Sequence, residues 1–177
     1  TFLGGRVAAD FTTYEGKALS AKIIQDRAYA KESIILCDFI WPMKWTLYPG
    51  GHVGDPTLES QIISAITGAD IDTAELNRIG EAIFNLQRAI SLRQGWQGRA
   101  DDKLLDYYYN EPLKEGEIFF SKNCEVMGPE GKPISKLGNM LDFATVEQLK
   151  DEYYQLRGWD IASGLPLKST LVALGLS

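Results

Sequence analysis

The chain has 177 residues, of which 45% are hydrophobic and 24% are charged, and its formal net charge is −6. This composition suits a globular protein that buries a core, and an acidic chain without a basic stripe argues against a nucleic-acid partner. No apolar run approaches the roughly 20 residues that a membrane span needs, and no signal-peptide pattern is present, so we expect no membrane partner.

The two cysteines, Cys37 and Cys124, are too few for a disulfide framework, which favours a reducing, cytoplasmic location. The chain starts at Thr1 without a methionine, and its first residues look like the interior of a protein sequence. We therefore expect a fragment of a larger polypeptide. No composition shift marks an internal boundary, so residues 1–177 are expected to form a single helical domain.

Residues 15–36 are rich in helix formers, and no proline or glycine interrupts them after Gly16. Their apolar side chains recur at helical spacing. The sequence therefore predicts a long helix that carries Cys37 at or just beyond its C-terminal end.

Residues 38–56 contain three prolines, which forbid a regular helix, together with several large aromatic side chains. Such a loop is expected to pack against the core, a ligand or a partner. It contains His52, the only histidine of the chain. A lone loop histidine is usually polar surface, and the alternative is a proton donor or substrate contact in a larger active cavity.

Residues 72–95 form the clearest helix in the sequence. Asp72 and Glu75 resemble a capping box at its start, and Gly95 supplies a stop at its end. Apolar side chains recur every three or four residues and predict one buried face. These side chains are Leu76, Ile79, Ile83, Leu86 and Ile90.

Shorter helices are predicted over 58–67, 103–109, 145–157 and 167–174. Thr145 matches a capping residue for the third of these. Residues 113–139 are irregular, and a turn signal at 128–131 predicts a small hairpin or extended excursion. The fold class is therefore all-α, with an irregular or hairpin excursion near 113–139.

Cys37 is the strongest candidate for chemistry. It could be a buried thiol that behaves as a small apolar residue, or a thiolate ligand to a metal or cluster whose other ligands lie outside this chain. Cys124 is interpreted as non-functional. The adjacent Asp101 and Asp102 are interpreted as helix-capping residues rather than catalytic ones.

Three stretches together resemble the C-terminal region of the aldehyde ferredoxin oxidoreductase family. They are RIGEAIFNLQRAISLRQG at 78–95, GRADDKLLDYYYNEPLKEG at 98–116 and DEYYQLRGWDIASGLPLKSTLVALGL at 151–176. The resemblance implies a multihelical C-terminal domain of a larger enzyme. It also implies tungsten or molybdenum on a bis-pterin cofactor, a neighbouring four-iron (4Fe-4S) cluster, oxidation of aldehydes to carboxylic acids and electron transfer to ferredoxin.

The family carries a D-x-x-G-L-C motif whose cysteine is the fourth cluster ligand and whose aspartate holds a pterin. The corresponding stretch here is ESIILC at 32–37, in which Leu36 and Cys37 match, Glu32 replaces the aspartate and Ile35 replaces the glycine. The resemblance therefore implies Cys37 as a cluster ligand, and Glu32, Leu36 and Asp38 as residues near the pterin.

The remaining expectations also follow from the resemblance. The isolated fragment should be inactive and hold no cofactor, and its partners should be the N-terminal domains of the same polypeptide and ferredoxin or another electron carrier. A homo-oligomer is left open. The alternatives are an aryl-CoA reductase subunit of the same family and a helical interaction module without a cofactor.

Overall fold

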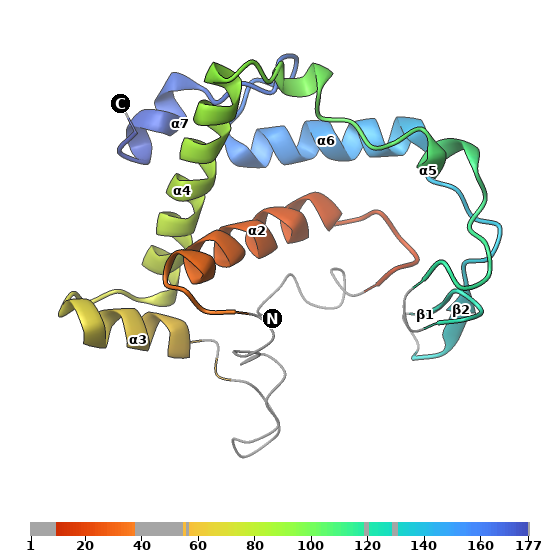
Figure 1. The fold of residues 1–177 in the computed structure, drawn as a ribbon, viewed down its shortest axis with the longest axis horizontal. Helices are drawn as coiled ribbons and strands as arrows, with labels where there is room; N and C mark the ends of the chain where they lie inside the picture. Colours follow the sequence, from red (N-terminus) through yellow and green to blue (C-terminus); the bar gives the residue numbers. More distant parts are fainter. Residues whose placement is uncertain (1–9, 38–54, 56, 119–120, 129–130, 177) are drawn as a thin grey trace. The chain divides into compact units, whose positions relative to one another are not determined.

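The computed structural model describes residues 10–37, 55, 57–118, 121–128 and 131–176 (Figure 1). The chain divides into two compact units. One unit comprises residues 96–165 and the segment that ends at residue 21, and the other comprises residues 22–95 and the C-terminal residues from 166. As the sequence predicts, the described residues are mainly helical, with one small two-stranded sheet.

The unit around residues 22–95 is built from helices. They are most of α2 (Lys17–Ser33), α3 (Leu58–Thr67), α4 (Thr73–Arg93) and the C-terminal α7 (Lys168–Ala173). The helix predicted over 15–36 thus begins and ends slightly inside its expected bounds. It ends before Cys37, as the sequence indicates.

Helix α4 begins as predicted, because the side chain of Asp72 accepts a hydrogen bond of 2.7 Å from the backbone N–H of Glu75. Its buried residues, however, are Leu76, Gly80 and Asn85. The prediction of a fully buried apolar stripe is wrong at its C-terminal end, where Leu86 and Ile90 are each 46% exposed.

Charged side chains fill the contacts among α2, α3 and α4. Lys22 bridges Asp26 at 2.8 Å and Glu81 at 3.0 Å, and Arg27 pairs with the buried Glu59 on α3. Buried charges are tolerated when each is paired. This unit therefore joins its helices through ion pairs as well as apolar packing.

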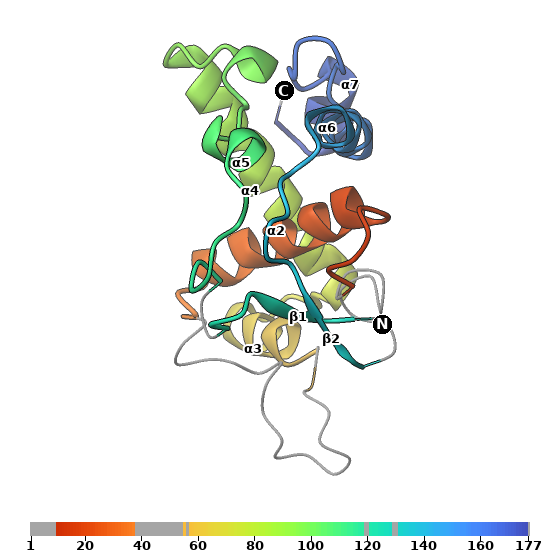
Figure 2. The same ribbon diagram turned by 90° about the vertical axis from the view of Figure 1, so that its right-hand side faces the viewer.

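The other unit contains the short η1 (Gly98–Ala100), α5 (Tyr107–Asn110), strands β1 (Glu125–Met127) and β2 (Pro133–Ser135), and α6 (Phe143–Arg157). The two strands pair antiparallel, with Val126 opposite Ile134, and form the hairpin that the turn signal predicts (Figure 2). Cys124 precedes β1 and is fully buried, and its thiol lies 2.9 Å from the carbonyl oxygen of Lys114. Its role is therefore to pack this region.

Helix α6 begins two residues earlier than predicted. Its capping residue is Asp142, whose carboxylate accepts hydrogen bonds from both the backbone N–H and the hydroxyl of Thr145. The capping role expected of Thr145 is thus wrong, because the aspartate three residues earlier supplies the stronger acceptor. The helix ends at Gly158, whose φ of 64° confirms the predicted stop.

Among the helices in the described part of the chain, none combines the length and the apolar character that crossing a membrane requires.

Candidate functional site

The turn that ends α2 carries the residues of the expected cofactor motif. The backbone N–H of Ile35 bonds to the carbonyl of Glu32 at 3.0 Å, and that of Leu36 bonds to the carbonyl of Lys31 at 3.2 Å. This pair of bonds is typical of a helix end whose next residue adopts a left-handed conformation. The turn therefore fixes the backbone just before Cys37.

Ile35 occupies the left-handed position of this turn, with a φ of 62° and a side chain that is 91% exposed. A β-branched residue is strained in this conformation, which glycine adopts freely. The position at which the family motif has glycine is thus one where the backbone favours glycine. The exchange to isoleucine leaves the left-handed turn in place and adds an exposed apolar side chain.

Cys37 is a free, exposed cysteine. The interpretation of Cys37 as a buried apolar thiol is therefore wrong. Glu32 is exposed on the last turn of α2, and Leu36 is half-buried. The structure brings these three residues together at one helix end, whereas Asp38 and His52 lie outside the described residues.

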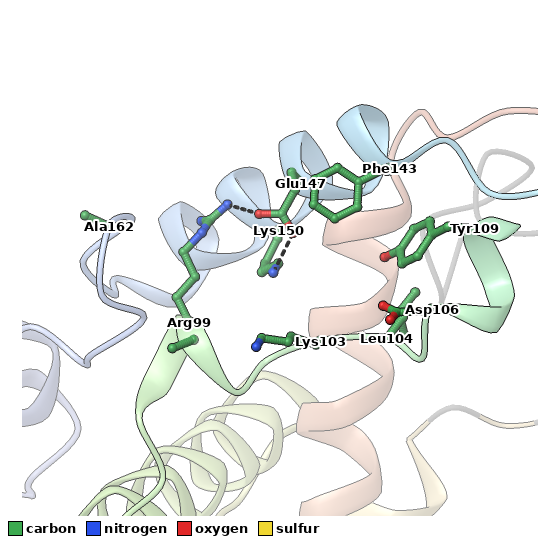
Figure 3. A pocket seen from close by; sticks show the side chains of 10 residues that line it. Arg99, Lys103, Leu104, Asp106, Tyr109, Phe143, Glu147, Lys150 and Ala162 are labelled. Atoms are coloured by element: carbon green, nitrogen blue, oxygen red, sulfur yellow. Dashed lines mark hydrogen bonds and ion pairs between the residues drawn. The ribbon is translucent and has the colours of Figure 1, made fainter.

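A second group of polar side chains surrounds a cavity of about 460 Å³ in the unit of residues 96–165 (Figure 3). Arg99 donates to Glu147 at 2.6 Å, to Asp151 at 2.5 Å and to the carbonyl of Ile161 at 3.0 Å. Lys150 pairs with the same Glu147 at 2.7 Å. Glu147 therefore joins two cations in one wall of the cavity.

The electrostatics of this wall favour its charged state. Burial acts to raise the pKa of Glu147, but hydrogen bonds from Lys150 and Arg99 outweigh it and hold the pKa below its ordinary value. Burial likewise opposes the charge of Arg99, and its bonds to Glu147 and Asp151 raise the pKa of the guanidinium. The wall is thus a set of ionised groups that fix one another.

Behind this wall, Asp102 accepts hydrogen bonds from the Tyr154 hydroxyl at 2.5 Å and from the Trp96 indole at 3.0 Å. Its backbone carbonyl also accepts from Lys150 at 2.8 Å. The helix-capping role expected of Asp102 is therefore wrong, because its carboxylate supports a buried aromatic side chain. Asp101 instead accepts from the backbone N–H of Gln97 at 2.7 Å.

Sequence reasoning missed the group around Arg99. Glu147, Lys150 and Asp151 are spaced three and four residues apart, a pattern that indicates a shared helix face. Their partner Arg99 lies 48 residues before Glu147, and no local pattern indicates that contact.

The family model described as "Aldehyde ferredoxin oxidoreductase, domains 2 & 3" matches residues 4–176 of the chain. A tungsten-containing aldehyde ferredoxin oxidoreductase of Pyrococcus furiosus is 29% identical over 116 residues, which are 66% of this chain and 16% of that protein. The corresponding protein of Pyrococcus horikoshii is 28% identical over 117 residues, again 66% of this chain and 16% of the relative.

Among solved structures, the active-site complex BamBC of benzoyl-coenzyme A reductase, in complex with 1,5-dienoyl-CoA, matches with a TM-score of 0.57. The match covers 95% of this chain and 21% of that chain, at 20% sequence identity, and therefore shows a shared fold. The matched segment is thus a small part of each of these larger proteins.

Proposed function

Because the chain belongs to the aldehyde ferredoxin oxidoreductase family, we propose that it is the C-terminal part of a tungsten- or molybdenum-pterin oxidoreductase. The complete protein would oxidise aldehydes to carboxylic acids and pass electrons to ferredoxin. The observation that carries this proposal is the placement of Cys37, an exposed free thiol directly after the end of α2, where Leu36 and Cys37 match the last two residues of the family's motif.

The thiol of Cys37 has the donor chemistry that a four-iron cluster needs. Four-iron clusters are held by cysteine thiolates, and Cys37 offers an accessible thiol on a backbone fixed by the bonds at the end of α2. When bound, the cluster would carry single electrons between the pterin metal and an external acceptor. In this proposal Cys37 holds one iron and Glu32 contacts the pterin, with Leu36 beside it.

The chain by itself would be inactive. One thiolate cannot hold a four-iron cluster, which several cysteine thiolates normally bind together. The chain spans 16% of the length of the curated relatives that it matches. We propose that the other cluster ligands and a second pterin contact come from the remaining part of the polypeptide.

Several large apolar side chains on α3 and α4 are exposed on the surface of this chain. Leu86 and Ile90 on α4 are each 46% exposed, and Ile66 on α3 is 75% exposed. Leu86 and Ile90 are four residues apart and therefore neighbour each other on one face of α4, and adjoining exposed apolar groups of this kind are a feature of interaction surfaces. We propose that the rest of the polypeptide covers them.

A reductase that acts on aromatic acyl-CoA esters is the second candidate. It is favoured by the fold shared with the benzoyl-coenzyme A reductase complex over 95% of this chain. Substrate assays on the complete protein, with an aldehyde in one series and an aryl-CoA in the other, separate the two reactions.

The experiment that tests the proposal is metal analysis of the complete protein after anaerobic expression and purification. We expect iron together with tungsten or molybdenum to co-purify. If none of these metals is present, the oxidoreductase proposal fails and the alternative of a helical interaction module without a cofactor is favoured.

A further inference from the structure

The cavity beside Arg99 has two different sides. On one side the charged groups are held by ion pairs and hydrogen bonds, and on the other side the side chain of Lys103 forms neither within the described residues. Arg99, Lys150 and Glu147 form the fixed side, since each is held by ion pairs or hydrogen bonds of 3.0 Å or less. Its volume of about 460 Å³ lies in the range of pockets that hold small molecules. A preformed pocket of this kind costs little to organise when a ligand binds.

The opposite side contains Lys103, whose side chain forms no ion pair or hydrogen bond within the described residues. Figure 3 shows its ammonium group directed toward the Arg99 side of the cavity, whereas Asp106 lies at the Tyr109 side. Lys103 is therefore the cation on the lining that is available to a ligand.

Apolar surface lies next to this cation. Phe143 is 61% exposed and meets the ring of Tyr109 edge to face, with the ring centroids 5.3 Å apart. Leu104 also lines the cavity and is 45% exposed. Exposed aromatic and aliphatic groups beside a few charged side chains are the usual composition of a small-molecule pocket.

We propose that this cavity binds a small carboxylate with an apolar body. The carboxylate pairs with Lys103, and the apolar part lies against Leu104, Phe143 and Tyr109. A single available ammonium suits a singly charged carboxylate, because Arg99 and Lys150 are already neutralised by Glu147 and Asp151. A more highly charged phosphate would meet no second available cation among the lining residues.

Tyr109 completes the pocket at its other end. Burial first, and then the nearby carboxylates of Glu147 and Asp106, raise the pKa of the Tyr109 phenol. The phenol thus stays protonated and adds no negative charge at the end of the pocket that takes the apolar part of the ligand. A cationic ligand would reach Asp106 but would be repelled by Lys103.

The test uses the 177-residue chain labelled with nitrogen-15 and titrated with phenylacetate while backbone amide shifts are followed. Phenylacetamide has the same apolar body without the charge, acetate has the charge without the body, and phenethylammonium reverses the charge. We expect saturable shifts with phenylacetate at residues 103–109 and 143–150, and weaker binding of the other three compounds.

Two variants identify the cation. Lys103→Met should weaken phenylacetate binding about tenfold, the usual effect of losing one charge-assisted contact, and Lys103→Arg should retain it. Lys168→Met removes an exposed lysine on α7 outside the cavity and should leave binding unchanged. The proposal is overturned if phenylacetate gives no saturable shifts, if phenylacetamide binds equally well, or if the two methionine variants behave alike. None of these outcomes depends on the cluster at Cys37.

Discussion

The carbonyl oxygen of Asp26 on α2 lies 1.9 Å from the point at which a Cβ on Gly80 of α4 would stand. Both residues are buried, so the two helices approach each other through bare backbone at this point. A glycine inside a helix ordinarily weakens it. Here the absence of a side chain at Gly80 permits the close approach of α4 to the backbone of α2.

Gly80→Ala should therefore destabilise the chain although alanine favours helix. The methyl group would overlap backbone that cannot move alone, and overpacking of this kind costs about 1–3 kcal/mol. Chemical denaturation measures the loss. Asn77→Ala, on the same helix, is the control and should show no loss; equal stability of the Gly80→Ala protein and the wild type would contradict the close approach.

Tyr154→Phe removes a buried hydroxyl that donates to the Asp102 carboxylate at 2.5 Å. We expect a loss of about 1–3 kcal/mol, because a hydrogen bond to a charged acceptor is lost inside the protein. Thermal and denaturant unfolding would measure it. Tyr108→Phe, at a tyrosine that is 46% exposed, serves as the control and should change stability little. Similar losses in both variants would argue against a structural role for the Asp102 contact.

Ile35→Gly should stabilise the chain. The left-handed conformation costs an ordinary residue about 1–2 kcal/mol relative to glycine, and the 91% exposed side chain gives up little burial. The greater freedom of glycine in the unfolded chain offsets part of this gain. Ile66→Gly, at an exposed isoleucine within α3, should instead lower the unfolding free energy by about 0.5–1 kcal/mol. If both variants lose stability alike, Ile35 is not strained.

The ion pairs of Glu147 predict a dependence of stability on pH. Its carboxyl has a lowered pKa in the folded chain, so its contribution is fully present above the unfolded pKa, about 4.3 for glutamate, and is lost as the pH falls through the folded value. The stability difference between wild type and Glu147→Gln should therefore be largest near neutral pH and shrink below this value. Denaturant unfolding across the acidic range measures it, and a difference that does not change with pH would contradict the ion pairs.

Local signals predicted the helices well. Asp72 and Gly158 act as the cap and the stop that their residue types indicate, because both effects involve only neighbouring backbone. At the start of α6, the capping-box pattern at Thr145 indicated the wrong residue, because Asp142, three residues earlier, also belongs to a favoured capping type.

Long-range contacts were not predictable in the same way. Asp102 and Tyr154 are separated by 52 residues, and nothing in the pattern around either indicates the other. The apolar stripe of α4 was visible, but its burial depends on which neighbours cover it. Leu86 and Ile90 are each 46% exposed, although they belong to the same stripe as the buried Leu76.

The central claim is that Cys37 holds one iron of a four-iron cluster, and Cys37→Ser in the complete protein tests it most directly. Electron paramagnetic resonance and iron content would be measured on anaerobically purified wild type, Cys37→Ser and Cys124→Ser, the last at a buried thiol without an expected cofactor role. We expect the cluster signal to be lost or altered in Cys37→Ser alone. An unchanged signal and iron content in Cys37→Ser would contradict the ligand role of Cys37.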